Sequence, residues 1–567
     1  MLAALARGDT SAAHDIAMRL IEGFPERGVA WKVAGALRWA AGRTDEALAA
    51  MRTSVRLLPQ DAEAHCNLGL TLTHLQQFEA AEPYFTRAVE IDPRFSIAHY
   101  RLGMSYFLQG RLAAAQASLR RGIACKTNYA HGDDAQNHSN LLFVSSHDPD
   151  VGAASLCDEH RRFGEEFEGR LAGSWPAHAN ERSPGRTLKV GFVSGDLHDH
   201  SVGRFLEPLL AELARRPHLQ LHAYCTNPRE DAISRRLRAH CPHWVAVETF
   251  LDIPLAEKII EDQIDILIDL AGHTGHNRLP VFARKPAPVQ VSWLGYPGTT
   301  GLTAIQYYLA DPLWLPPGQF DWMFTEKLVY LPDRWAFEPY AAAPAVAPLP
   351  ALTTGRLTFG SFHRLGKINP ATVRLWSELL RAFPTSTLLM VGIRLHGQEK
   401  ALLEQFAAHG IESARLELHD RCPMDRYLGF HNQVDIALDT LAYSGATTTM
   451  HSLSMGVPTL TIAGGTPQAR ACAGILAHVG LDRFIASDAA DFLAKARHWA
   501  AHLDDLAALR SGLRTRLRQT PGANPALIAD HIDQALRRMW QRWCGGLPAE
   551  SFHTETPCAL PPTGTLA

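Results

Sequence analysis

Residues near the start of the chain repeat with a period of 34, and this regularity constrains the fold more than any other feature. Three series of small or helix-ending residues recur at that spacing: Gly35, Gly69 and Gly103; Ala47, Ala81 and Ala115; and Pro25, Pro59 and Pro93. Glycine and alanine let two helices approach each other closely, and proline ends a helix. The spacing therefore predicts stacked helical hairpins over residues 1–128.

The repeating pattern resembles the tetratricopeptide repeat, with about three full units after a half unit that begins at Met1. That start predicts either repeats missing upstream or an array that is naturally short. Stacked repeats of this kind form a concave groove that usually takes a peptide or another protein. We therefore expect a peptide or protein partner along the repeat groove.

The charge balance and the cysteines exclude some classes of protein. The chain has 55 basic and 58 acidic residues and a net charge of −3, whereas a dedicated nucleic-acid binder carries a strongly basic domain. No apolar stretch reaches the roughly 18 residues of a membrane helix. The nine cysteines contain no CxxC pair, which is typical of reduced thiols in a cytoplasmic protein. We expect no nucleic-acid partner, no membrane partner and a cytoplasmic location.

Beyond residue 128 the pattern changes to a helical connector, expected over 129–186, and then to strands alternating with helices. From Leu188, short apolar runs that read as buried on both faces indicate a parallel sheet. This first lobe is expected over residues 187–340, with a cleft between it and the lobe that follows. Its predicted strands are Leu188–Ser194, Leu219–Cys225, Ile264–Leu270, Val289–Leu294, Ile305–Ala310 and Lys327–Leu331.

A linker rich in proline and alanine, Tyr340–Pro350, separates this lobe from a second alternating series. The second lobe is predicted over 341–546, including C-terminal helices, and residues 547–567 are predicted to be a flexible tail. The fold class is thus a helical repeat array followed by two doubly wound, Rossmann-like α/β domains, with ligands at the carboxyl ends of strands. The strands of the second lobe are expected at Leu357–Phe362, Thr387–Gly392, Leu416–His419, Val434–Asp439 and Thr459–Ala463.

The sequence lacks the glycine-rich signatures of two large ligand classes. No GxGxxG follows the first strand of either lobe, which disfavours a dinucleotide-dependent dehydrogenase, and the absence of GxxxxGK[ST] excludes a P-loop ATPase. Asp148–Asp150 and His198–His200 contain metal-ligand residue types, but their spacing supplies too few further ligands. We therefore predict that no metal and no cofactor is required.

Two segments at strand ends of the first lobe carry candidate site residues. The segment 195–201 contains His200, which either moves a proton near neutral pH or only bonds to backbone. The segment 293–301 contains three glycines and Pro297, which predict a tight loop that either approaches a ligand or is only a structural turn.

Two further segments belong to the second lobe. Arg364 and Lys367 follow its first strand, where fixed cations suit a diphosphate leaving group, and a solvated surface lysine is the alternative. Thr447 and Thr448 stand where a helix is expected to begin, so N–H groups and hydroxyls there suit an anion; plain N-capping by Ser444 or a threonine is the alternative. Together the segments predict a nucleotide diphosphate held by the second lobe, as in a metal-independent sugar transferase.

Nearly the whole chain resembles the protein O-linked N-acetylglucosamine transferases, and among them the bacterial members. The most specific matches are Trp-Leu-Gly-Tyr-Pro-Gly-Thr at 293–299, Leu365 to Ile368, and Leu438-Asp439-Thr440 through Thr448. The resemblance implies repeats joined to two catalytic lobes of the GT-B type. It also implies inverting transfer of N-acetylglucosamine (GlcNAc) from UDP-GlcNAc to serine or threonine hydroxyls without a metal.

The resemblance implies roles for individual residues around the donor phosphates. Lys367 matches the lysine that neutralises the diphosphate, and Arg364 stands where the family has a phosphate-contacting glutamine. Thr447 and Thr448 match the threonines that hold the β-phosphate.

Three first-lobe residues also match the family. His200 matches its active-site histidine, a proposed general base near the phosphate and the acceptor. Gly295 and Pro297 match the loop that lies against the sugar.

Five positions depart from the pattern of the animal enzymes. Tyr427 stands where they stack a histidine on uracil, and Met424 replaces a lysine near the ribose. His451 replaces an aspartate that binds ribose hydroxyls. Ala446 replaces a histidine beside the donor, and Gly366 replaces a tyrosine. The lysine and the two threonines matched to the diphosphate are kept, whereas the departures concern the base, the ribose and turnover.

Two alternative functions stay open at this point. One is a protein O-fucosyltransferase of the plant type, which has the same architecture but uses GDP-fucose, because the departures surround the base and the ribose. The other is a repeat-based scaffold whose lobes bind a nucleotide with weak or no turnover.

Overall fold

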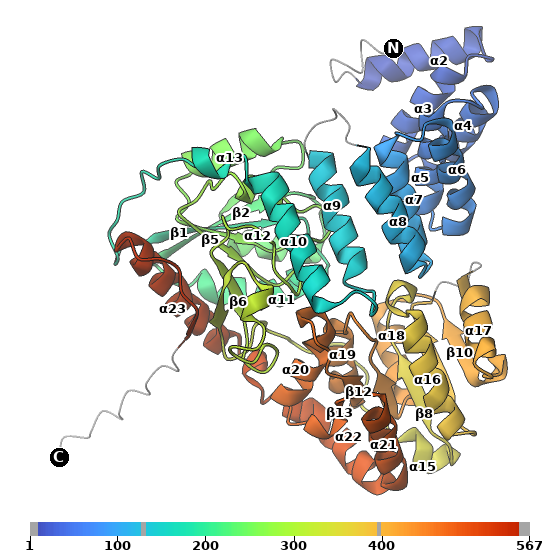
Figure 1. Ribbon diagram of the computed structural model, residues 1–567, viewed down its shortest axis with the longest axis vertical. Coiled ribbons are helices and arrows are strands. Elements are labelled where there is room, and N and C mark those ends of the chain that lie inside the picture. The colour runs from blue at the N-terminus through green and yellow to red at the C-terminus, as the bar shows by residue number, and fades with distance from the viewer. Residues whose placement is uncertain (1–9, 126–131, 394–397, 555–567) are drawn as a thin grey trace. The chain divides into compact units, whose positions relative to one another are not determined.

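A computed structural model describes residues 10–125, 132–393 and 398–554 of the chain (Figure 1). The chain divides into two compact units: residues 1–145 with 394–401, and residues 146–393 with 402–567. The first unit contains the repeats, and the second contains two β-sheets with their helices.

The first unit is built from helical hairpins in which glycines meet the partner helix. A Cβ built on Gly69 would lie 2.7 Å from the ring of Phe85, and one on Gly35 would lie 2.7 Å from the Met51 side chain. These close approaches explain the glycine series and confirm the predicted repeats. The helices are α2 (Thr10–Gly23), α3 (Gly28–Ala40), α4 (Thr44–Leu57), α5 (Ala62–His74), α6 (Phe78–Ile91), α7 (Ser96–Leu108), α8 (Leu112–Ala124) and α9 (Gly132–Ser145).

Helix α9 extends the first unit beyond residue 128, where the repeats were predicted to end. Leu141 and Val144 of α9 share a buried cluster with Leu112 and Leu119 of α8. The predicted connector is thus divided. Helix α9 packs on the last repeat helix because of its apolar face, whereas α10 (Ala153–Glu168) and η1 (Ala172–Ser174) belong to the second unit.

The first sheet of the second unit has the strand order β14-β7-β6-β5-β4-β1-β2-β3, and all of its pairs are parallel. Six of the seven residues of β1 are buried, as expected for a strand covered on both faces. The strands are β1 (Leu188–Ser194), β2 (Leu219–Cys225), β3 (His243–Ala246), β4 (Ile266–Asp269), β5 (Val289–Ser292), β6 (Tyr307–Ala310), β7 (Lys327–Tyr330) and β14 (Phe552–His553).

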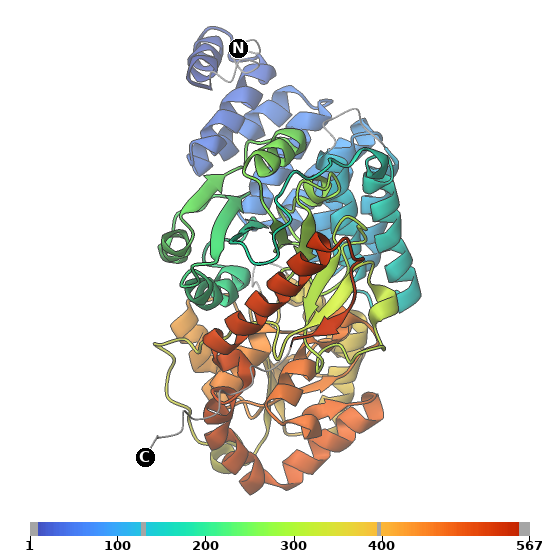
Figure 2. The ribbon, with the colours of Figure 1, turned by 90° about the vertical axis from the view of Figure 1, so that its left-hand side faces the viewer.

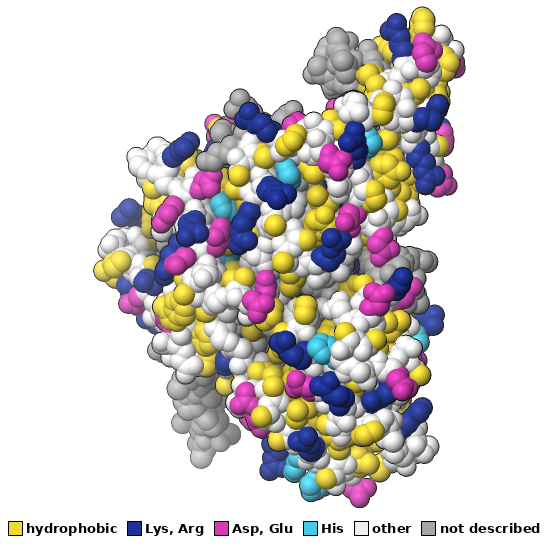
Figure 3. Space-filling model, turned by 45° about the vertical axis from the view of Figure 1, so that its right-hand side comes forward, with side chains coloured by type: hydrophobic (Ala, Val, Ile, Leu, Met, Phe, Trp, Pro, Cys, Tyr) yellow, Lys and Arg dark blue, Asp and Glu magenta, His cyan; other side chains and the backbone are white. Residues whose placement is uncertain are grey.

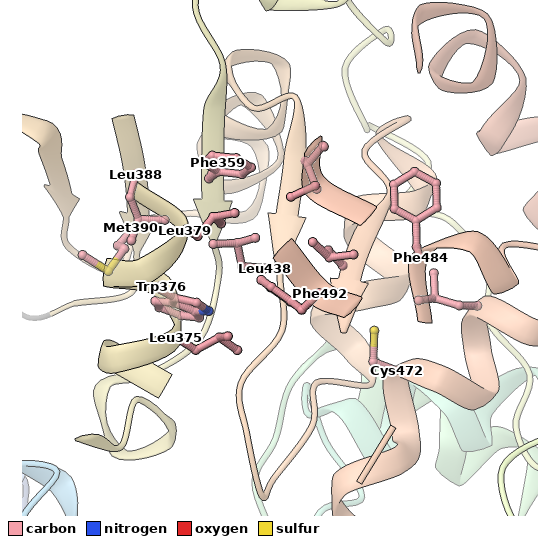
Figure 4. Close-up of a cluster of buried hydrophobic side chains, with 14 of the residues drawn as sticks. Phe359, Leu375, Trp376, Leu379, Leu388, Met390, Leu438, Cys472, Phe484 and Phe492 are labelled. Carbon is pink, nitrogen blue, oxygen red and sulfur yellow. The ribbon is translucent and has the colours of Figure 1, made fainter. Parts of the chain in front are cut away.

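The second sheet has the order β10-β9-β8-β11-β12-β13 and is also parallel throughout. Its core contains Phe359, Trp376 and Leu438, which come from two strands and the covering helix α16 (Figure 4). The two predicted doubly wound domains are therefore confirmed. The strands are β8 (Thr358–Ser361), β9 (Thr387–Val391), β10 (Leu416–His419), β11 (Ile436–Leu438), β12 (Thr459–Ile462) and β13 (Ile485–Ala486).

Helices cover both sheets, and the last of them returns from the second lobe to the first. Figure 2 shows this helix, α23 (Pro525–Cys544), lying across the strands of the first sheet. Its residues Ile528, Leu536 and Trp540 share the buried cluster of β1 and β5. The other helices of four residues or more are α11 (Ser201–Leu213), α12 (Ala232–His240), α13 (Asp252–Glu261), α14 (Leu279–Phe282), α15 (Pro350–Thr354), α16 (Pro370–Ala382), α17 (Gln398–Ala408), α18 (Met424–Phe430), α19 (Thr447–Ser454), η6 (Pro467–Arg470), α20 (Ala471–His478), α21 (Ala489–Ala501) and α22 (Leu503–Leu517).

Part of the segment predicted to be a flexible tail, 547–567, belongs to the first sheet. Strand β14 pairs with β7, and Phe552 is buried with its ring 6.4 Å from that of Tyr307. The prediction was wrong for these residues because a two-residue strand with one apolar side chain leaves no periodic pattern. Residues 555–567 lie outside the described part of the chain.

The surface charges and the cysteines of the described residues agree with the nearly balanced charge and the reduced thiols expected from the sequence. On the face shown in Figure 3, Lys and Arg side chains are interspersed with Asp and Glu side chains. Among the described residues, no helix combines the length and the hydropathy that a bilayer-crossing segment needs. The eight described cysteines are all free thiols, and Cys558 lies outside the described residues.

Candidate functional site

Four loops at the carboxyl ends of strands carry the predicted site residues. The loop after β1 leads into α11, and the loop after β5 contains Gly295 and Pro297. In the second lobe, the loop after β8 contains η3 (Leu365–Lys367), and the loop after β11 leads into α19. This placement follows from parallel topology, in which all strands of one sheet end at the same edge.

Asp439 fixes the loop that precedes α19. Its Oδ2 accepts hydrogen bonds from the hydroxyls of Ser444 at 2.6 Å and Thr461 at 2.7 Å, and its Oδ1 accepts one from the Gly445 N–H at 2.8 Å. Helix α19 then begins at Thr447, and the preceding Ala446 provides no side-chain cap. Plain capping by Ser444 is thus wrong, because that hydroxyl bonds to Asp439, and the N-terminus of α19 lacks a side-chain acceptor.

The N-termini of two helices from different lobes meet at this point. The Thr447 hydroxyl, in the first turn of α19, donates a hydrogen bond of 3.1 Å to the hydroxyl of Ser201, in the first turn of α11. Each helix carries a partial positive charge at its N-terminus. Two such ends side by side favour an anion between them.

Lys367 places an amino group, which is positively charged when protonated, next to the same loop. Its Nζ donates to the Ser444 carbonyl at 3.3 Å and lies 4.6 Å from the centre of the Tyr443 ring. Burial lowers the pKa of Lys367 to about 7, with a further contribution from Arg364, while Asp439 acts in the opposite direction. Lys367 is therefore not the solvated surface lysine of the alternative interpretation, whereas the Arg364 side chain is exposed.

His200 occupies the N-cap position of α11 and is 45% exposed. Its Nδ1 accepts a 3.3 Å hydrogen bond from the Val202 N–H and also lies 3.6 Å from Oδ2 of Asp196. A neutral imidazole that accepts at Nδ1 carries its proton on Nε2 and is a donor there. If Nδ1 instead donates to Asp196, Nε2 is free to accept a proton. The choice between these two partners decides whether His200 can act as a base.

Aromatic rings gather beside the residues expected near the base and the ribose. The Tyr427 ring, on α18, lies 5.5 Å from that of His451 and 5.6 Å from that of Phe362. Burial lowers the pKa of His451 to about 4, and Arg204 lowers it further, so this imidazole is neutral at pH 7. Met424 is the first residue of α18.

The loop with Gly295 and Pro297 is tied to the α19 loop through Gln468. Gln468 Nε2 donates to the Tyr296 hydroxyl at 3.2 Å, and the backbone carbonyl of Gln468 accepts from the Ser444 N–H at 2.9 Å. A Cβ on Gly295 would lie 2.1 Å from the Leu270 carbonyl oxygen, so only glycine fits. The conformation predicted as a tight loop thus depends on close backbone contact.

Sequence reasoning missed three residues of this arrangement, Ser201, His363 and Gln468. Ser201 and Gln468 each form a hydrogen bond with a residue of the other lobe. His363 lies next to Asp439, a residue far along the chain. Since each of these contacts is long-range, no local spacing could have identified them. Gly366 is buried beside Lys367.

The two segments with metal-ligand residue types, 148–150 and 198–200, have other partners. The Asp150 N–H donates to the Asp148 carboxylate in a turn, and His198 Nε2 lies 3.5 Å from the Arg229 guanidinium. Among the described residues, one group of ligand atoms lies within 4.8 Å of one another, on Asp311, Asp333 and His478.

Family comparisons match both parts of the chain. The sequence model of glycosyl transferase family 41 matches residues 171–340 and 350–524, more than half of the chain. Tetratricopeptide repeat models match residues 2–62, 62–95 and 97–125.

Individual proteins are also similar to this chain. Proteins of Petunia hybrida and Arabidopsis thaliana, each named a probable UDP-N-acetylglucosamine–peptide N-acetylglucosaminyltransferase SPINDLY, are 33% and 34% identical over 426 and 402 residues. The matches cover 73% and 69% of this chain but 45% and 43% of the relatives, so the chain spans less than half of their length. A mutant O-GlcNAc transferase of Thermobaculum terrenum superposes with a TM-score of 0.84 at 31% identity, covering 92% of this chain and 99% of that one.

Proposed function

The chain belongs to glycosyl transferase family 41, and on that premise we propose that it transfers GlcNAc from UDP-GlcNAc to serine or threonine hydroxyls of proteins, with inversion at the anomeric carbon. The observation that carries the proposal is the meeting of the α11 and α19 N-termini beside Lys367. That site offers an anion two helix ends and one ammonium group. The leaving group of a sugar nucleotide is a nucleoside diphosphate, and these positive groups would stabilise its negative charge.

In the proposed reaction, the acceptor hydroxyl attacks the anomeric carbon in line as the bond to the β-phosphate oxygen breaks. The proton of the hydroxyl goes to Nε2 of His200, held in position through Asp196, or to an oxygen of the donor phosphate. Negative charge develops on the departing UDP, where Lys367 and the N–H groups of α19 stabilise it. Arg364, exposed beside them, adds a second cation, and no metal is needed in this scheme.

The loop with Gly295 and Pro297 is proposed to hold the sugar, and Tyr427 and His451 the base and the ribose. Two rings at these positions offer apolar faces and one neutral imidazole, which suit stacking with either a pyrimidine or a purine. The peptide acceptor is proposed to follow the groove of the repeats.

The first experiment is calorimetric titration of the full chain with UDP and with GDP, in the presence of EDTA. Tight binding of UDP alone supports the proposal and its independence of metal. Preference for GDP would replace UDP-GlcNAc with GDP-fucose as the donor. Binding of neither nucleotide would contradict a transferase role and favour a repeat-based scaffold whose lobes no longer bind a nucleotide.

Transfer itself is tested with UDP-GlcNAc and candidate acceptor proteins. Lys367→Ala is expected to lower kcat by about 100- to 1000-fold, the usual effect of removing one group that stabilises transition-state charge. Lys495→Ala is the matched control, since this lysine lies on α21 and pairs with Asp491 at 3.5 Å. Full transfer by Lys367→Ala would exclude the role given to that ammonium group.

A further inference from the structure

Two polar atoms lie buried without a hydrogen-bond partner on either side of Gly445. They are Nδ1 of His363 and Oγ1 of Thr448. A Cβ built on Gly445 would lie 2.2 Å from Thr448 Oγ1 and 2.3 Å from His363 Cε1, so glycine allows both side chains to approach the same place. A buried polar atom without a hydrogen-bond partner destabilises the fold, so two of them at one place indicate a binding partner.

The opposite edge of the His363 ring faces Asp439. Nε2 of His363 lies 3.5 Å from Oδ1 of Asp439, and the side chains are only 4% and 2% exposed. Asp439 already accepts hydrogen bonds from Ser444, Gly445 and Thr461, which is the behaviour of a carboxylate rather than a protonated acid. The ring is therefore oriented with an N–H at Nε2 toward the carboxylate, and its Nδ1 is left on the side of α19.

The charges around Nδ1 select the kind of ligand. Thr448 belongs to the first turn of α19, whose N-terminus meets that of α11, and Lys367 reaches the loop between them. Lys367 is also the charged group that acts most strongly on His363. A positive surrounding with two unused hydrogen-bonding atoms suits an anionic oxygen.

Resting on the proposed function, we propose that His363 is a positioning residue for the donor, whose Nδ1 hydrogen-bonds to the diphosphate while Asp439 holds the ring from behind. Thr448 Oγ1 donates to the same phosphate group. Because a phosphate oxygen only accepts, Nδ1 must donate to it. With Nε2–H already facing Asp439, the ring takes up one proton from the solvent when the diphosphate binds.

The burial of His363 agrees with a ring that is neutral before the diphosphate binds and protonated afterwards. In the ligand-free protein, burial lowers the pKa of His363 to about 3, and Lys367 lowers it further, so the ring is neutral. A diphosphate beside Nδ1 then favours the charged ring, in the same direction as the hydrogen bond to the Leu438 backbone. The histidine thus changes protonation only when the anion is present.

Two substitutions of His363 by an amide residue distinguish the contributions of the two ring nitrogens to binding. The amide of His363→Asn occupies the place of Nδ1, and that of His363→Gln extends to the place of Nε2. We expect His363→Ala and His363→Gln to weaken UDP binding about 10- to 100-fold and to leave uridine binding unchanged, because uridine has no phosphate. His363→Asn is expected to bind UDP within about threefold of the wild type and to take up one proton fewer, since its amide donates at any pH.

The measurements are calorimetric dissociation constants for UDP and uridine at pH 6.5 and 8, with thermal melting of each variant as the control for folding. If the wild type prefers GDP, then GDP and guanosine replace the two probes. Equal losses of UDP and uridine affinity, or recovery by Gln but not Asn, would overturn the proposal in favour of a structural role at Asp439. Unchanged UDP affinity in His363→Ala would overturn it as well. Failure of the proposed function looks different, because the wild type itself would then bind GDP in place of UDP, bind neither diphosphate, or bind UDP without transferring GlcNAc.

Discussion

At the scale of single residues, Lys367 shows how a site can be prepared for an anion. Burial holds the pKa of Lys367 near 7, far below the usual value of a lysine, and a bound diphosphate would raise it again. Binding must therefore be coupled to proton uptake wherever the free lysine is mostly neutral. Affinity for UDP should rise as the pH falls from 9 toward 7 and level off below, as far as this group is concerned.

The coupling can be measured by calorimetry in buffers of different ionisation enthalpy. At pH 8, a group with a free pKa of about 7 should take up about 0.9 proton on binding. Lys367→Met is expected to lower the measured uptake by that amount, and the surface variant Lys495→Met to leave it unchanged. An uptake that Lys367→Met does not alter would mean that the lysine is already charged in the free protein.

The two possible partners of His200 predict different kinetics. If Asp196 holds Nδ1–H and Nε2 acts as the base, Asp196→Asn should lower kcat by about 100-fold or more and leave the affinity for UDP within about twofold. The reason is that the Val202 N–H would then fix the tautomer with the proton on Nε2. Single-turnover transfer rates from pH 6 to 9 test this. Retention of the rate in both Asp196→Asn and His200→Ala would assign the proton to the donor phosphate instead.

Residues of the site differed in how far sequence could predict them. Lys367, Thr447 and Thr448 follow strands with clear apolar patterns, so their place at the carboxyl edge of the sheet could be predicted. His363 and Gln468 stand in equally suitable segments, but their roles depend on Asp439 and Tyr296, contacts that only folding creates. A long-range contact has no sequence spacing, and this is why these two residues were missed.

At the scale of elements, the strands that sequence could predict are the long and fully buried ones. Strands β1 and β2 have the predicted bounds. In each of them, six of the seven residues are buried. Strand β3 (His243–Ala246) was not predicted, because its residues are half-buried or exposed at the sheet edge and show no apolar run. Edge strands form because a neighbour offers hydrogen bonds, which a local pattern does not record.

The hairpins of the repeat unit give a prediction for stability. Gly69→Ala places a Cβ 2.7 Å from the Phe85 ring, closer than packed atoms allow, and should destabilise the repeats by about 1–3 kcal/mol. Gly23→Ala is the matched control, because nothing lies within 4 Å of the added Cβ. Thermal or urea unfolding measures both changes. If Gly69→Ala is as stable as Gly23→Ala, the close glycine contact does not determine hairpin packing.

At the scale of the whole molecule, a buried cluster joins the two lobes. His478 of α20, in the second lobe, lies 3.1 Å from Asp311 and 4.0 Å from Asp333, both in the first lobe. The carboxylates raise the pKa of His478 to about 8 against the cost of burial, with Arg334 as an opposing cation. The charged imidazole therefore holds the lobes together.

This cluster predicts how stability depends on pH. Because the folded pKa of about 8 is above the ordinary value of 6.5, the contribution of His478 is complete below pH 6.5 and is lost as the pH rises through 8. The loss amounts to at most about 2 kcal/mol. Urea unfolding at pH 6.5 and 9 should show this loss of unfolding free energy in the wild type and not in His478→Gln. An equal pH dependence in the variant would show that other groups are responsible.

The return of α23 and β14 to the first sheet has a consequence for biosynthesis. A ribosome makes β1 to β7 first, then the entire second lobe, and only then the helix and strand that cover and extend the first sheet. Until that point, the surface that receives Ile528, Leu536 and Trp540 faces the solvent. The first lobe is thus translated early but completed last, and a premature stop codon before Pro525 would damage the end of the molecule that had already been made.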